Sequence, residues 1–151
     1  MFNTLKKRIK NEEGLSLVEL LAVIVILAIV AAIAIPAIGN IIESSRVKAA
    51  KADAANVLNA GQIFFLENPE EETFTGTAPA TDESKWAPYI TDLGTIESFT
   101  VTKVGTGNTV TTSGKSGGKA YSIEAATLSE LDLDNGKVGE KFSWGTKKVG
   151  E

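Results

Sequence analysis

A long apolar run lies near the start of the chain. Every residue from Leu20 to Ile35 is Leu, Ile, Val or Ala, and no charged residue occurs between Glu19 and Glu43. Extended to Ile38, the run reaches the lower end of the roughly 17–25 residues that an α-helix needs to cross a bilayer. The pattern therefore predicts a membrane-spanning helix at the N-terminal end.

After this run the apolar residues become periodic. The spacing i, i+3, i+4, i+7 predicts that the helix continues from Asn40 to about Leu66 with one apolar face, and Asn68-Pro69 should end it. Such a face is expected to pack against a sheet. The face consists of Ala50, Ala54, Val57, Leu58, Gly61 and Phe65, and its polar neighbours are Arg46, Lys48, Lys51 and Asp53.

The C-terminal half has the alternating, turn-interrupted pattern of an antiparallel meander. Ile96–Val104 alternates and is rich in branched residues, so it predicts a strand, with a turn over Gly105–Asn108. The further expected elements are a returning strand at Thr109–Thr112, a glycine-rich turn at Ser113–Gly118, a strand at Ala120–Ala125, a tight turn at Asn135-Gly136 and a last strand within Val138–Trp144.

The segment between the helix and these strands lacks a clear period. Glu70–Ser84 is rich in Glu, Thr, Pro and Ala, which predicts an exposed loop, and its acidic start, Glu70 to Glu72, reads as a solvated face more readily than as a cation site. The aromatic cluster Trp86–Ile90 is expected to pin this loop to the core, with sugar binding as the weaker alternative. The predicted fold class is α+β: a long N-terminal helix with an antiparallel sheet on its second half.

Composition narrows the function classes. The formal net charge is -4; the first 13 residues carry a net +2, which leaves -6 for the remainder. An acidic soluble part argues against nucleic-acid binding, which relies on Lys and Arg to neutralise phosphates. The chain has no Cys and no His. Disulfides and thiolate sites are therefore impossible, and the commonest general base is missing. We expect neither catalysis nor a metal or cofactor.

The start of the chain allows three interpretations. A basic leader with Lys6, Lys7, Arg8 and Lys10 precedes the apolar run, so the positive-inside rule places the N-terminus in the cytoplasm and everything after Pro36 outside. The helix could be a permanent anchor, or a secretory signal cleaved at Ala32-Ile33-Ala34. The third interpretation is a leader that is cleaved before the apolar run, and it also accounts for the acid and the proline.

The third interpretation rests on a resemblance. The stretch Gly14-Leu15-Ser16-Leu17-Val18-Glu19 resembles the processing site of type IV pilins and pseudopilins. The resemblance implies that prepilin peptidase cuts between Gly14 and Leu15, that the new amine of Leu15 is methylated, and that Glu19 is the acid fifth after the cut. Leu15 replaces the more usual Phe or Met. The cysteine pair of many pilins is absent, which favours a Gram-positive source.

The same resemblance assigns roles along the helix. Cleavage would create an ammonium group on Leu15, one helical turn from Glu19, and pairing the two would offset the cost of a carboxylate beside the apolar layer. Glu19 is thus expected to set subunit register during assembly. Pro36 removes a backbone donor and Gly39 weakens the helix, so a bendable joint is expected there. The implied organisation is a leader (1–14), an assembly helix (15–39) and a helix continuation with a β-sheet head (40–151).

The function that follows is a filament subunit that polymerises through its apolar helix. Its implied partners are identical subunits, prepilin peptidase and an assembly machine with a cytoplasmic ATPase, and the membrane holds it before assembly. Motility, adhesion, DNA uptake and secretion are all compatible uses. The alternatives are a pseudopilin of a secretion or competence machine and a membrane-tethered binding domain that never polymerises.

Overall fold

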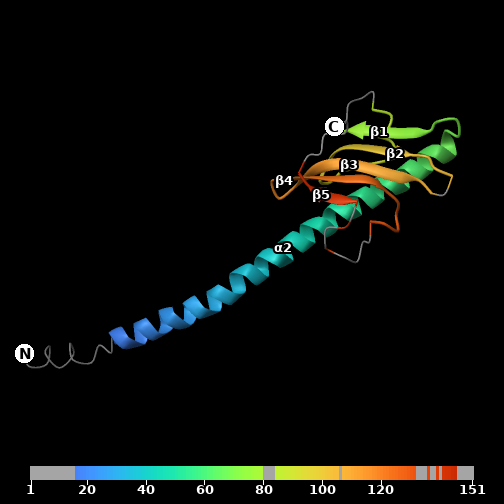
Figure 1. Ribbon diagram of the computed structural model, residues 1–151. Helices are drawn as coiled ribbons and strands as arrows, with labels where there is room; N and C mark the ends of the chain where they lie inside the picture. The colour runs from blue at the N-terminus through green and yellow to red at the C-terminus, as the bar shows by residue number, and fades with distance from the viewer. Residues whose placement is uncertain are drawn as a thin grey trace, which may run out of the picture. The chain divides into compact units, whose positions relative to one another are not determined.

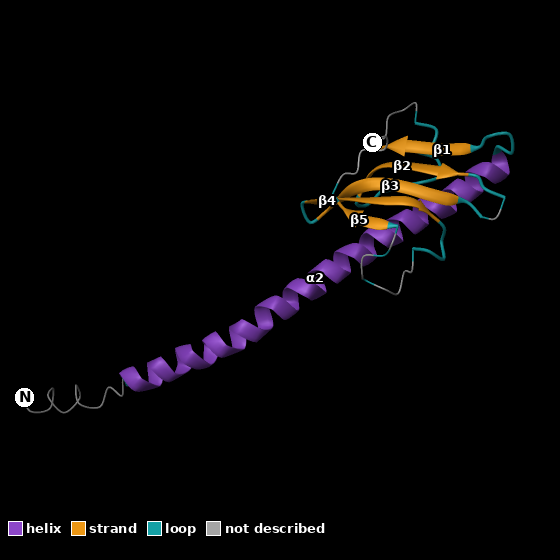
Figure 2. Cartoon of the chain, in the orientation of Figure 1, coloured by secondary structure: helices purple, strands orange, loops and turns teal. Residues whose placement is uncertain are grey.

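The structure, a computed structural model, describes residues 16–79, 84–105, 107–131, 136, 139 and 141–145. Within these residues the long helix α2 (Leu17–Glu67) is followed by the strands β1 (Thr73–Thr77), β2 (Ile96–Thr102), β3 (Thr109–Ser116), β4 (Lys119–Ala126) and β5 (Phe142–Trp144). Figure 2 shows α2 and the strands that follow it, coloured by secondary structure. The α+β class predicted from the sequence is confirmed.

The chain divides after Ile41 into two units. The described residues of the first unit belong to α2, apart from Ser16 before it. The second unit begins at Ile42 and holds the rest of α2 and the whole sheet. The helix ends as predicted: the side-chain amide of Asn68 donates to the Phe64 carbonyl oxygen at 3.0 Å, and Pro69 follows.

The five strands form one antiparallel sheet in the order β1-β2-β3-β4-β5, so the predicted meander is confirmed. In the second unit the sheet lies along one side of α2 (Figure 1). Short turns join β2 to β3 and β3 to β4, as antiparallel neighbours allow, whereas the longer segments 78–95 and 127–141 join β1 to β2 and β4 to β5. At the β3–β4 turn Gly117 and Gly118 have φ values of +59° and +81°, the positive φ that a two-residue hairpin needs at both positions.

Two of the predicted boundaries are wrong. The expected loop Glu70–Ser84 contains β1, since the alternation of Thr73 to Thr77 places Phe74 in the core and the threonines outside. The expected turn at Ser113–Gly118 is a strand as far as Ser116, because Gly114 and its neighbours complete the ladder to β4. The last strand begins at Phe142. Part of its predicted range and Asn135 lie outside the described residues.

The core lies between the second part of α2 and the sheet. All six residues of the predicted apolar face are buried, and Gly61 is so close to β2 that an added Cβ atom would lie 2.8 Å from Val101 Cγ1. Lys51, expected among the polar neighbours, is instead only 3% exposed. The helix therefore buries a wider face than its apolar stripe alone indicates.

Aromatic rings close the end of the core nearest to the helix C-terminus. The rings of Phe64 and Phe74 stack at 4.7 Å, and Tyr89 meets Phe64 edge-to-face at 5.5 Å. Trp86 is buried and lies against Phe99. The aromatic cluster at residues 86–90 thus packs on the core, as the sequence predicts.

A polar network joins α2 to the start of β2. The backbone N–H of Thr95 donates to Asp53 Oδ2 at 2.8 Å, and the Thr95 hydroxyl donates to the same oxygen at 2.7 Å. Because that proton is used, the Tyr121 hydroxyl donates to Thr95 Oγ1, at 2.9 Å. Burial raises the pKa of Tyr121 to about 12, and the charge of Asp53 adds to the rise.

Candidate functional site at the start of α2

The first turn of α2 has a reciprocal capping arrangement. The Ser16 hydroxyl accepts from the backbone N–H of Glu19 at 3.2 Å, and Glu19 Oε2 accepts from the backbone N–H of Ser16 at 2.8 Å. Ser16 is the residue before the helix and Glu19 is its third residue, the spacing of a capping box. Two backbone N–H groups that have no acceptor within the helix thereby gain a hydrogen bond.

This geometry fixes the position of the Glu19 carboxylate. Its partner, the Ser16 amide nitrogen, belongs to the peptide bond with Leu15. The carboxylate is therefore held at the residue that directly follows the expected new N-terminus. Gly14 and Leu15 themselves lie outside the described residues, so the cleavage and the methylation stay predictions.

Ser16 is a site residue that the sequence analysis did not single out. The signal was present, because Ser-x-x-Glu before an apolar run is the sequence pattern of a capping box. Glu19 therefore has a structural role that needs no cleavage, besides the predicted pairing with an amine. An experiment on Glu19 has to separate these two roles.

Among the described residues, no side chain buries the apolar part of α2. No residue from Leu17 to Arg46 is buried, and large aliphatic side chains are widely exposed, for example Leu17 at 81% and Ile33 at 72%. Within the described residues α2 is the helix that is long and apolar enough to cross a membrane. Contiguous apolar surface of this extent marks a contact with lipid or with another protein surface.

The predicted joint at Pro36 and Gly39 lies within α2, which continues through both residues. A Cβ atom added to Gly39 would meet no described atom within 4 Å. Gly39 is therefore not required by a close packing contact. The bend expected here stays a prediction.

The described residues offer no evident metal centre. No three acidic side chains among them are grouped so that they could hold an ion. In the acidic run after the helix, Glu71 Oε1 lies 3.8 Å from Lys85 Nζ, and both side chains are exposed. This weak surface ion pair fits a solvated segment.

Comparison with known proteins identifies the N-terminal segment. Residues 9–35 match the family model described as "Prokaryotic N-terminal methylation motif". No curated protein and no solved structure matches the chain. The matched range contains Gly14, Leu15 and Glu19 together with most of the apolar run, and it is the signature of type IV pilins and pseudopilins.

Proposed function

We propose that this chain, a type IV pilin-like or pseudopilin-type protein by its methylation motif, is the structural subunit of a type IV pilus-like filament. The observation that carries the proposal is the motif at the entrance to an apolar helix that no described side chain buries. Its motif is that of structural, pilin-type proteins and not of an enzyme family. Assembly is then the activity of the chain.

The exposed apolar helix supports polymerisation through the N-terminal segment. Before assembly a bilayer would cover the aliphatic side chains between Leu17 and Ile42. In a filament the same side chains would pack against those of neighbouring copies. Both environments are apolar, so transfer between them needs little net hydrophobic free energy, and polar pairing at Glu19 can decide the register.

The position of Glu19 supports an electrostatic step at assembly. An isolated charge within the apolar layer costs about 2.5–3.5 kcal/mol on insertion scales and less near the interface. Cleavage before Leu15 would place a positive amine one residue from the amide that Glu19 already binds. An ion pair with the subunit's own amine or with that of a neighbour would offset this cost.

Substitutions at two positions separate the ion pair from the capping box. Glu19→Gln keeps an oxygen acceptor and remains a good third residue of a capping box, but it removes the charge. Glu19→Ala removes both, and Ser16→Ala removes about 1 kcal/mol of capping with the charge intact. Filaments counted by electron microscopy should be absent in both Glu19 variants and present in Ser16→Ala.

The outcomes of this comparison are distinct. If Glu19→Gln assembled as well as the unaltered chain, capping would account for Glu19 and the charge-pairing mechanism would be wrong. If Ser16→Ala alone abolished filaments, the start of the helix and not the charge would control assembly. Immunoblots of the membrane fraction show that each variant is produced.

The pseudopilin alternative shares all of this chemistry and differs in polymer length. Filaments long and abundant enough to see at the cell surface would favour the pilus subunit. The expected Gram-positive source rests on the missing cysteines alone and stays a prediction.

A further inference from the structure

The outward face of β1, β2 and β3 carries hydroxyl side chains at regular positions. In β1 the core side chain is Phe74, whereas Thr73, Thr75 and Thr77 are exposed. β2 and β3 alternate in the same sense. Their outward hydroxyl residues are Ser98, Thr100, Thr102, Thr109, Thr111 and Ser113. We call the nine positions the hydroxyl grid.

The strand register aligns these residues into three rows. Thr75 is paired with Thr100, and Thr100 with Thr111, so the middle row crosses all three strands. In the row on one side, Thr73 is paired with Thr102 and Thr102 with Thr109. In the row on the other side, Thr77 is paired with Ser98 and Ser98 with Ser113. Neighbouring strands lie about 4.7–4.9 Å apart, and same-face residues along a strand lie roughly 6.6–6.8 Å apart. The grid is thus a two-dimensional array with a short, constant repeat.

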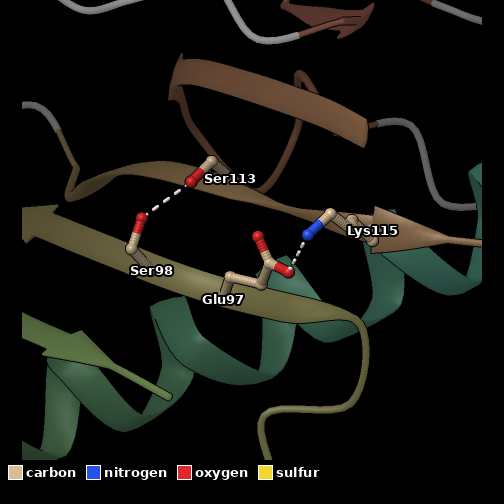
Figure 3. Close-up of polar contacts among 4 residues, drawn as sticks. All are labelled: Glu97, Ser98, Ser113 and Lys115. Carbon is tan, nitrogen blue, oxygen red and sulfur yellow. Dashed lines mark hydrogen bonds and ion pairs between the residues drawn. The ribbon is translucent and has the colours of Figure 1, made fainter. Parts of the chain in front are cut away.

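Most of these hydroxyl groups form no hydrogen bond within the described part of the chain. Ser98 and Ser113 bond to each other across the strands at 2.7 Å, as Figure 3 shows on the side of the sheet away from α2. Thr111 Oγ1 accepts from the Ala125 N–H at 3.1 Å and keeps its own proton. The other six hydroxyls form no hydrogen bond to a described residue. They can donate and accept towards a ligand.

The charges around the grid restrict the ligand. None of the nine positions carries a charge, an aromatic ring or a long aliphatic chain. At the border Lys115 donates to Glu97 Oε1 at 2.8 Å, so these two charges neutralise each other (Figure 3). A polyanion gains no attraction here and is repelled by the net charge of -4. An apolar ligand would bury little apolar area against these small hydroxyl side chains.

We propose that the hydroxyl grid is a docking surface for a neutral, polyhydroxylated polymer, that is, an uncharged glycan. Such a ligand presents donors and acceptors together and repeats them along its length, which complements an uncharged, repeating array. A glycan also extends over several grid positions, so many weak bonds form at once. The binding does not depend on polymerisation, although a filament would multiply it.

The affinity of a single copy should be low. A neutral hydrogen bond exchanges with water and contributes only about 0.5–1.5 kcal/mol net, which is roughly two- to tenfold in affinity. Many copies on one particle convert such weak contacts into strong retention. The test therefore uses the full chain inserted in liposomes through its apolar helix. This arrangement gives multivalency without any filament, so failure of the proposed assembly would not affect it.

The test measures sedimentation of these liposomes with three insoluble neutral glycans: cellulose, chitin and a β-1,3-glucan. Carboxymethylated cellulose of equal particle size is the anionic control. The triple variant Thr75→Val, Thr100→Val, Thr102→Val replaces three free hydroxyls by methyl groups and suits a strand. The matched triple serine variant keeps the hydroxyls. Unfolding followed by tryptophan fluorescence confirms that both variants fold.

We expect retention on at least one neutral glycan, weaker retention on the carboxymethylated form, a loss of at least about tenfold in the valine variant and near-normal retention in the serine variant. Any of three results would overturn the proposal: no retention on all three glycans, stronger retention on carboxymethylated cellulose, or equal retention of the valine variant.

Discussion

The hydrogen bonds of Asp53 offer a direct test of how the head is held together. Asp53 Oδ2 accepts two bonds from Thr95, at 2.8 and 2.7 Å, and thereby joins α2 to the segment that leads into β2. Hydrogen bonds to a charged group contribute about 1.5–3 kcal/mol each, and less where water can compete. Asp53 is only partly buried. We therefore expect Asp53→Ala to reduce the free energy of unfolding by about 2–3 kcal/mol.

A loss of this size is measurable because the head is small. For a domain of its length it corresponds to a fall in the unfolding midpoint of roughly 10 °C. Both tryptophans of the chain, Trp86 and Trp144, lie in the head. Their fluorescence therefore follows unfolding of the head in the full chain held in detergent micelles.

Two further variants make the measurement specific. Asp53→Asn keeps an oxygen acceptor and should lose only about 1 kcal/mol. Thr95→Val removes the hydroxyl but keeps the backbone donor, so a double-mutant cycle with Asp53→Ala isolates the side-chain bond. A change below about 0.5 kcal/mol in Asp53→Ala would refute the reasoning, since a surface substitution alone has that effect.

Three more predictions concern the core. Thr112 is 1% exposed and its hydroxyl finds no partner among the described residues, so Thr112→Val should raise stability to urea by about 1 kcal/mol, whereas an unchanged midpoint would indicate a hidden partner. Gly61→Ala should lower the free energy of unfolding by about 1–2 kcal/mol because the new methyl group would clash with Val101 Cγ1. Gly39→Ala is the matched control and should not lower it, because an added Cβ atom meets no described atom within 4 Å there. Because the pKa of Tyr121 is raised to about 12, the folded state keeps its proton where the unfolded state has lost it; stability should fall by about 2–3 kcal/mol as pH rises from about 10 through 12. Tyr121→Phe should flatten that part of the pH profile, and a parallel decline in both proteins would exclude this origin.

The sequence predicts the helix and its buried face well because both signals are local. A long aliphatic run without charge predicts a helix that is able to span a bilayer, and the stripe from Ala50 to Phe65 repeats with the helical period. The alternating strands after Ile96 are equally local. The pairing of β2 with β3 and of β3 with β4 follows from the short turns between them, whereas the longer segments 78–95 and 127–141 precede the pairings of β2 with β1 and of β5 with β4.

The features that the sequence did not predict depend on distant partners. β1 is polar at three of five positions and becomes a strand because β2 offers a free edge to Phe74 and its neighbours. Ser113 to Ser116 has weak strand propensity, yet pairing with β4 completes it. Lys51 is only 3% exposed, and helix periodicity does not indicate its burial. At the candidate site, Glu19 was predicted from the resemblance, whereas its local bond to Ser16 was missed, although Ser-x-x-Glu is the sequence pattern of a capping box.

The most direct measurement is the N-terminal sequence and mass of the polypeptide taken from purified filaments. In the proposed mechanism, proteolysis between Gly14 and Leu15 would create the positive group next to Glu19. We therefore predict a mature chain that begins with a methylated Leu15. Filaments built from chains that still begin with Met1 would contradict the assignment.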